Sequence, residues 1–173
     1  MEARLVGELP REPGWQFEPK WDGFRCLAFR AGDEVELRAK SGKTLSRYFP
    51  EVVAMLGAIA PESFIVDGEL AIPIGESLSF DALQARLHPA ESRVRKLASE
   101  TPAIFILFDC LMSADEVSLL DAPLTDRRAA LEDLFDSAKR EAALKLTPYT
   151  REYRDDRQAR LHRQCAGRSE SME

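Results

Sequence analysis

The chain has 173 residues, of which 45% are hydrophobic, so it is long enough for one domain with a buried core. It contains no apolar run of about 18 residues and no signal peptide, so no membrane partner is expected and a cytoplasmic location is predicted. Three widely spaced cysteines argue against a disulfide framework, and a net charge of −6 gives no general excess of cations for DNA phosphates. Any contact with nucleic acid would therefore need a local basic groove.

A lysine-bearing turn near the N-terminus is the first feature that suggests a chemical reaction. Residues 15–18 alternate between apolar and polar side chains and predict a strand, which leads into the sequence Glu-Pro-Lys-Trp-Asp-Gly-Phe-Arg. Lys20 is the candidate nucleophile toward a phosphate, Gly23 would let the backbone approach closely, and Arg25 would grip oxygens with its planar fork. Taken alone, the same residues also fit an ordinary surface hairpin turn at Asp22.

A lysine attacks a phosphate only as the neutral amine, whereas free lysine is almost fully protonated at neutral pH. Burial or a neighbouring cation favours the neutral form. We therefore expect Lys20 to be buried, or to lie beside Arg25 or a bound divalent metal.

The spacing Lys20-x-Asp22-Gly23-x-Arg25 resembles motif I of the covalent nucleotidyltransferases, which include ATP-dependent DNA ligases, RNA ligases and mRNA capping enzymes. Four fixed residues would arise by chance in about one chain in a thousand of this length, at roughly 5% per residue type. In that superfamily the motif lysine takes AMP or GMP as a phosphoramidate. The resemblance implies ATP and Mg²⁺ as cofactors, with Asp22 and Gly23 as part of the nucleotide site.

Residues 24–30 and 35–38 predict a hairpin, and Pro50 then opens a helix. The turn after the hairpin carries Lys40 and Lys43 and partly resembles ligase motif Ia, with Ala-Lys in place of the family's Ser-Arg. In the family this segment touches the nucleic-acid backbone, where a lysine acts as a point charge. The two lysines fit a plain exposed turn equally well.

Residues 64–72 predict an apolar strand interrupted by Asp67, Gly68 and Glu69. Polar residues inside such a strand are costly unless they are satisfied or face a cleft, so the interruption fits either a bulge or turn, or a site. The segment resembles motif III, whose glutamate hydrogen-bonds the ribose hydroxyl. The resemblance gives that role to Glu69 and suggests that Asp67 helps to hold metal or phosphate.

Residues 103–112 are the most apolar predicted strand and carry Phe105 and Phe108, both of which would ordinarily be core residues. The Phe-x-x-Phe-Asp pattern resembles motif IIIa, whose second aromatic stacks on the purine, so Phe108 is the expected purine platform. By the same comparison, Glu18 would lie near the exocyclic amine of adenine.

Other segments complete the predicted secondary structure. Residues 79–88 predict a helix capped by Ser79, residues 91–96 a solvated basic face, and residues 144–147 a short strand. A longer helix capped by Thr125 matches a Leu-x-x-Arg-Arg-x-x-Leu helix of the family.

The chain changes character after residue 150. Residues 151–173 are rich in arginine and poor in apolar side chains, which predicts a divergent charged tail after a partial adenylation domain at residues 1–150. Motifs IV and V and the OB-fold domain of the family are not found in the sequence. We therefore expect a truncation or frameshift near Cys165.

The expected fold is α+β, with antiparallel sheets flanked by helices, as an incomplete nucleotidyltransferase (adenylation) domain of ATP-grasp-like ligase type. The resemblance implies an ATP-dependent DNA ligase fragment that forms lysine–AMP for sealing 5′-phosphate/3′-hydroxyl nicks in DNA repair, recombination or replication. This chain by itself would bind nicked duplex DNA weakly or not at all. The alternatives are a catalytically incompetent nucleotide-binding remnant, or an RNA ligase or capping-type nucleotidyltransferase. The sequence assigns no metal ligands.

Overall fold

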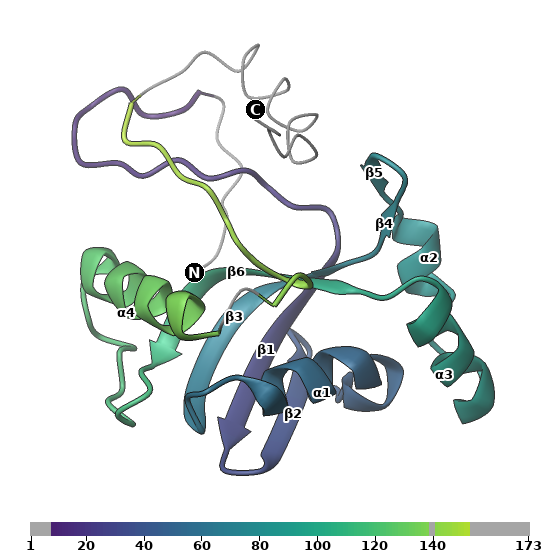
Figure 1. The fold of residues 1–173 in the computed structure, drawn as a ribbon. Coiled ribbons are helices and arrows are strands. Elements are labelled where there is room, and N and C mark those ends of the chain that lie inside the picture. The colour runs from purple at the N-terminus through teal and green to yellow at the C-terminus, as the bar shows by residue number, and fades with distance from the viewer. Residues whose placement is uncertain (1–7, 139–140, 153–173) are drawn as a thin grey trace, which may run out of the picture.

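A five-stranded sheet forms the centre of the fold, in the strand order β2-β1-β3-β6-β7 (Figure 1). The computed structural model describes residues 8–138 and 141–152. The sheet strands are β1 (Phe24–Ala31), β2 (Glu34–Ala39), β3 (Ser63–Ala71), β6 (Ile104–Met112) and β7 (Leu144–Leu146). Helices flank the sheet, so the predicted α+β class and the predicted hairpin of β1 with β2 are confirmed.

The sheet is mixed, although purely antiparallel pairing was expected. β1, β2, β3 and β6 pair antiparallel, but β7 runs parallel to β6. The chain leaves β6, passes through helix α4 (Leu124–Ser137) and returns beside β6. A helical crossover of this kind brings a strand back in its original direction, which explains the parallel pair.

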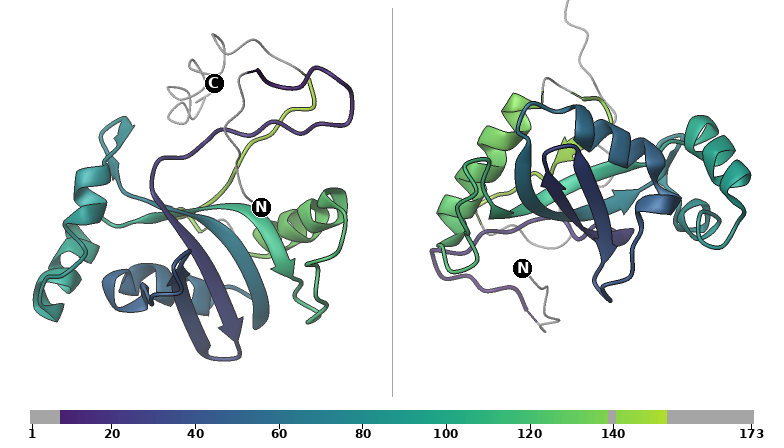
Figure 2. Two further views of the ribbon diagram at one scale, coloured as in Figure 1. Left: turned by 180° about the vertical axis from the view of Figure 1, so that it is seen from behind. Right: turned by 90° about the horizontal axis from the view of Figure 1, so that it is seen from below.

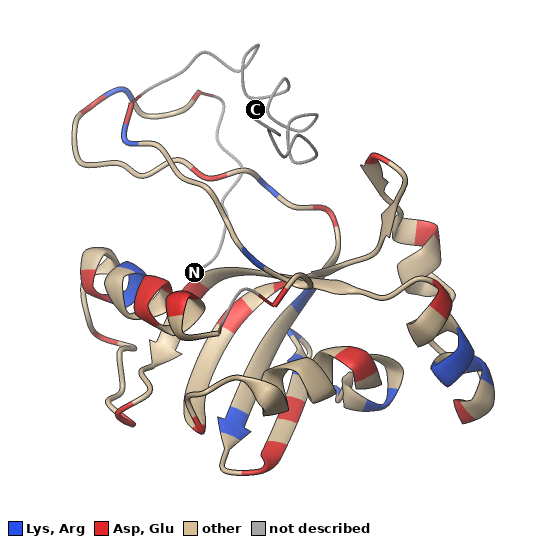
Figure 3. Cartoon of the chain, in the orientation of Figure 1, with Lys and Arg blue, Asp and Glu red and all other residues tan. Residues whose placement is uncertain are grey.

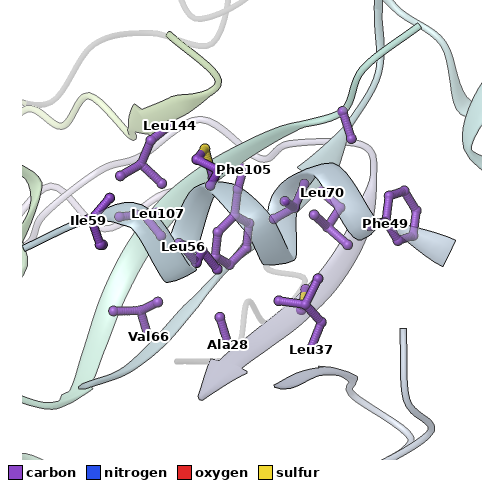
Figure 4. Packing of buried hydrophobic residues seen from close by; sticks show 14 of the residues in the cluster. Ala28, Leu37, Phe49, Leu56, Ile59, Val66, Leu70, Phe105, Leu107 and Leu144 are labelled. Atoms are coloured by element: carbon purple, nitrogen blue, oxygen red, sulfur yellow. The ribbon is translucent and has the colours of Figure 1, made fainter. Parts of the chain in front are cut away.

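Helix α1 (Pro50–Ala58) supplies the centre of the core, after a short 3₁₀ turn η1 (Ser46–Tyr48). Pro50 occupies its first turn, as predicted. Figure 4 shows Leu56 of this helix against side chains of β1, β3 and β6, including Ala28, Val66 and Phe105. Phe105 is fully buried, so it is a core residue.

The remaining helices lie at the two ends of the sheet. Figure 2 shows α2 (Phe80–Gln84) and α3 (Glu91–Glu100) at one end and α4 at the other, and the hairpin of β4 (Pro73–Ile74) with β5 (Ser77–Leu78) stands next to α2. The residues 91–96, expected to be only a solvated basic face, belong to α3, which buries Val94. Within the described chain, no helix is both long and apolar enough to cross a membrane.

The two predicted helix caps have different outcomes. The Ser79 hydroxyl accepts a hydrogen bond from the backbone N–H of Ala82 at 3.2 Å, so this cap is confirmed. The Thr125 cap is wrong, because Pro123, two residues earlier, occupies the capping position and α4 begins at Leu124. The Thr125 hydroxyl instead donates to Asp126 at 3.1 Å.

A buried arginine joins α2 and α3 to the rest of the domain. Arg86 is fully buried, and its guanidinium donates to the Glu51 carboxylate of α1 at 2.7 Å and to the carbonyls of Tyr48 and Thr101 at 3.0 Å. Glu51 also accepts from the N–H of Ala103 at 3.1 Å. This pair therefore fixes the end of the sheet where β6 begins.

Candidate functional site

The segment that carries Lys20 is a loop, so the predicted strand at residues 15–18 is wrong. Phe17 forms a single bridge with Thr150, in which each N–H donates to the other carbonyl at 2.8 and 3.0 Å. The alternating pattern reflects a half-buried loop that lies against the chain following β7. The Trp21 indole N–H donates to the Thr147 hydroxyl at 2.9 Å, which ties the loop to the same segment.

The Lys20 side chain lies in the open, so burial, one of the three expected ways to favour its neutral amine, is ruled out. Its Nζ is 2.7 Å from Asp22 Oδ1, and the two side chains are 77% and 70% exposed. The exposed Lys20 amine thus forms an ion pair with Asp22 at the surface of the loop, and the chain bends at Gly23.

Glu69 connects β3 to this loop. β1 and β3 pair Arg25 with Glu69, and the Glu69 carboxylate accepts a hydrogen bond from the Gly23 N–H at 3.0 Å. A side chain at Gly23 would clash with the Leu70 carbonyl oxygen, so only glycine allows this approach. Burial raises the pKa of Glu69, while the Gly23 hydrogen bond and the positive charges of Lys20 and Arg25 oppose this rise.

Arg25 lies between an acid and an aromatic ring. Its guanidinium is 2.6 Å from the Asp67 carboxylate and 5.7 Å from the centre of the Phe108 ring. The Asp67 side chain is only 2% exposed, so it anchors Arg25 rather than presenting oxygens to a metal or phosphate. The suggested metal or phosphate role of Asp67 therefore does not fit the geometry.

A β-bulge places Phe108 beside these charges. The pairing of β3 with β6 shifts between Asp67 and Gly68, which face Asp109 and Leu107, so Phe108 lies between the two registers. A bulge in the pairing with β6 therefore accompanies the interruption in β3, and a site at this place stays a prediction. Phe108 is only partly buried, unlike Phe105.

Glu18 lies partly buried on the other side of the Lys20 loop. Its carboxylate accepts a hydrogen bond from the Gln16 side-chain amide at 2.6 Å. Burial raises the pKa of Glu18, the Gln16 hydrogen bond and the Arg128 charge lower it, and Asp109 raises it. Glu18 therefore faces the region between β6 and α4.

Lys40 and Lys43 lie on an exposed turn at the end of β2. The Ala39 N–H donates to the Lys43 carbonyl at 2.9 Å, and Ala39 pairs with Cys26 near the start of β1. The turn is thus at the same end of the sheet as Arg25. Figure 3 shows acidic and basic residues mixed over the described elements, so the positive charge of this turn does not extend into a larger basic surface.

The structure adds Trp21 and Thr147 to the residues that the sequence singled out. No sequence pattern joins them, because they are 126 positions apart. In the sequence, Arg128 was identified only as part of a helix pattern. In the structure, its guanidinium N–H donates to the Thr147 carbonyl at 3.0 Å. Among the described residues there is no group of three His, Cys, Asp or Glu side chains arranged to bind a metal.

Comparison with known families gives a match over most of the chain. Residues 7–165 match the model of the ATP dependent DNA ligase domain. DNA ligase C of Mycobacterium tuberculosis is 46% identical over 152 residues, which are 87% of this chain and 42% of that protein. DNA ligase C2 of Mycolicibacterium smegmatis is 45% identical over 150 residues, 87% of this chain and 41% of that protein. The chain therefore spans less than half the length of these relatives.

Solved structures give a similar result. The ligase domain of LigD from M. tuberculosis superposes with a TM-score of 0.63 and 26% identity, covering 86% of this chain and 43% of that one. A mycobacterial DNA ligase D complexed with ATP and MES has a TM-score of 0.60 and 25% identity, covering 86% of this chain and 44% of that one.

Proposed function

Because the chain belongs to the ATP-dependent DNA ligase family, we propose that it performs the first chemical step of a ligase, the transfer of AMP from ATP to Lys20. One observation supports the proposal. The Glu69 carboxylate of β3 accepts a hydrogen bond from the Gly23 N–H in the loop that carries Lys20, and Glu69 is paired in register with Arg25. This contact supports the proposal because it joins the loop of the proposed nucleophile to the strand of the proposed ribose-binding carboxylate. The sealing of nicks by a longer protein that contains this chain is part of the same proposal.

The step proceeds by in-line substitution at the α-phosphorus of ATP. The Lys20 ammonium leaves Asp22 and gives one proton to solvent, and the lone pair of the neutral amine forms the nitrogen–phosphorus bond. The nitrogen then gives a second proton to solvent, which leaves the phosphoramidate N–H. The bond between the α-phosphorus and the bridging oxygen breaks, and the electron pair departs with pyrophosphate. Positioning and charge stabilisation dominate catalysis of such transfers, which is the contribution expected of Arg25.

The nucleotide would be oriented by three further side chains. The partly exposed Phe108 ring would stack on the purine, and the Glu69 carboxylate would accept from a ribose hydroxyl. Glu18 would accept from the exocyclic amine of adenine, which favours ATP over GTP. Arg25 lies within reach of both Phe108 and Glu69 and would contact the sugar.

Magnesium is proposed to enter with the nucleotide. Mg²⁺ usually keeps several waters and binds through substrate phosphates and one or two carboxylates, rather than through a full set of protein ligands. The absence of a three-residue cluster among the described residues is compatible with this mode. The ion would neutralise charge on the triphosphate, so the substrate is the magnesium complex of ATP.

DNA would be contacted by the exposed turn with Lys40 and Lys43. Both side chains would act as point charges on the phosphate backbone and would carry no sequence information. With a net charge of −6 on the chain, two lysines give only weak binding. We propose nicked duplex DNA as the substrate of a longer protein, with residues 1–150 as the adenylation part and residues 151–173 as a separate tail.

Labelling with ATP that carries ³²P on the α-phosphate tests the proposed step. A covalent adduct should form with Mg²⁺, should be absent in Lys20→Ala, and should persist in Lys96→Ala, which removes an exposed lysine of α3. Excess unlabelled ATP should compete better than GTP. If no adduct forms at any Mg²⁺ concentration while ATP still binds, the chain is a nucleotide-binding module and the proposal fails.

A further inference from the structure

The segment that follows β7 contacts both the loop of the proposed nucleophile and the strand of the proposed purine platform. Thr147 is fully buried. Its hydroxyl accepts from the indole of Trp21, the neighbour of Lys20, at 2.9 Å. Its backbone N–H donates to the carbonyl of Leu107, the neighbour of Phe108, at 2.9 Å.

These two hydrogen bonds have a geometric consequence. The Leu107 bond extends the pairing of β7 with β6, so the Thr147 backbone cannot move independently of the strand that carries Phe108. The hydroxyl then joins that strand to the Lys20 loop, in addition to the backbone bridge of Phe17 with Thr150 and the Gly23–Glu69 hydrogen bond. Of these contacts, the Thr147 hydroxyl is the one that reaches the residue next to Lys20 from the segment bonded to the Phe108 strand.

Helix α4 contacts Thr147 through Arg128. The Arg128 guanidinium donates to the Thr147 carbonyl at 3.0 Å and to the Glu132 carboxylate at 2.6 Å, and it lies 4.7 Å from the centre of the Tyr149 ring. Arg128 is itself buried. Since the N–H, the carbonyl and the hydroxyl of Thr147 are all engaged, the residue has little freedom to adjust if one bond is lost.

We propose that Thr147 is a positioning residue for Lys20, acting through the indole of Trp21. This inference rests on the proposed adenylation of Lys20. Thr147 touches neither nucleotide nor amine, so its effect is on the fraction of time that the amine is aligned with the α-phosphate. A misplacement of this kind lowers the rate of the chemical step and leaves ATP binding unchanged.

Three variants separate a positioning role of Thr147 from a general effect on the stability of the fold. Thr147→Val keeps the shape and removes the hydroxyl, Thr147→Ser restores it, and Thr150→Val removes a hydroxyl from the same segment without affecting the Trp21 bond. The rate of adduct formation at saturating ATP should fall about fivefold or more in Thr147→Val, the loss of one hydrogen bond. It should stay within about twofold of wild type in Thr147→Ser and Thr150→Val, with KM for ATP unchanged throughout.

The contact has a direct readout that does not depend on activity. The chain has two tryptophans, so ¹⁵N-labelled tryptophan gives two indole N–H signals in an NMR spectrum. The Trp21 signal, assigned by its loss in Trp21→Phe, should shift and exchange faster with water in Thr147→Val but not in Thr147→Ser. Trp15, whose side chain is exposed, is the internal reference.

The outcomes are distinct. An unchanged Trp21 signal in Thr147→Val, or an unchanged rate of adduct formation, overturns the positioning role. A double variant Trp21→Phe/Thr147→Val that is slower than Trp21→Phe alone overturns the route through the indole. Absence of adduct in the wild-type chain refutes the proposed function instead, and the indole signals then still establish whether Thr147 holds the loop.

Discussion

The guanidinium of Arg25 on β1 and the carboxylate of Asp67 on β3 form an ion pair at 2.6 Å, with a second hydrogen bond from Arg25 Nε at 3.1 Å. Asp67 is almost fully buried, whereas Arg25 is about one quarter exposed on the side of Phe108. A buried acid thus holds an arginine at the surface of the proposed nucleotide site. This arrangement explains why a carboxylate is tolerated inside an apolar strand.

Replacement of Asp67 by asparagine should weaken both the fold and the site. The buried position loses its charge while Arg25 loses its anchor, and we expect the free energy of unfolding to fall by about 1–3 kcal/mol. Urea denaturation followed by tryptophan fluorescence measures the change. Glu36→Gln breaks an exposed pair with Arg38 and should leave the urea midpoint where it is. Equal effects from the two variants would show that burial of the Arg25–Asp67 pair is unimportant.

Substitution of Gly23 by alanine should slow adduct formation strongly. The new methyl group would meet the Leu70 carbonyl oxygen and the Glu69 side chain, so the loop must move away from β3. We expect a loss of at least about tenfold in the labelling rate, since small displacements at a reacting centre are costly. Gly57→Ala in α1 is the matched control, because its methyl group has room and alanine favours a helix by about 0.5–1 kcal/mol. A fully active Gly23→Ala would remove the close approach from the mechanism.

The rate of adduct formation should decline as the pH is lowered through the titration of Glu69. The protonated carboxyl loses its negative charge and binds a ribose hydroxyl less well. Because burial raises the pKa of Glu69 above 4.5, the decline should begin at a higher pH than for an ordinary glutamate. Glu69→Gln should lower the rate and remove this part of the pH profile, while Glu76→Gln in the β4–β5 turn should keep it. A profile that is the same in Glu69→Gln and wild type would assign the titration to another group.

Replacement of Arg86 by methionine should destabilise the domain. The partly buried Glu51 carboxylate would lose its cation, and the carbonyls of Tyr48, Leu97 and Thr101 would lose a donor. We expect the free energy of unfolding to fall by about 3–5 kcal/mol, measured by urea denaturation. Arg95→Met, which removes an exposed pair with Glu91 on α3, should cause no measurable change. A stable Arg86→Met would mean that apolar packing replaces the ion pair, and the double variant with Glu51→Met would then be as stable as wild type.

The sequence predicted the family and the main strands because their signals are local. Motif spacing around Lys20 and the apolar runs at residues 24–30, 64–72 and 103–112 depend only on neighbouring residues. The matches to DNA ligases confirm the family, and β1, β3 and β6 confirm the strands. The arginine-rich tail lies outside the described residues from position 153 onward.

The local sequence pattern led to wrong predictions where contacts between distant segments determine the structure. Residues 15–18 alternate like a strand but form a loop, in which Phe17 makes an isolated bridge with Thr150 of the chain after β7. The antiparallel expectation missed β7, since only the path through α4 sets its direction.

Residue types and their order along the chain determined which groups are available: an amine, an acid pair, an arginine and an aromatic ring. Only the tertiary structure decided that Arg25 is held by Asp67 and that the Lys20 loop is tied to Thr147, 126 positions from Trp21. The physical reason is that a hydrogen bond acts over about 3 Å, while the register that brings two distant segments within that range is set by the packing of the whole sheet.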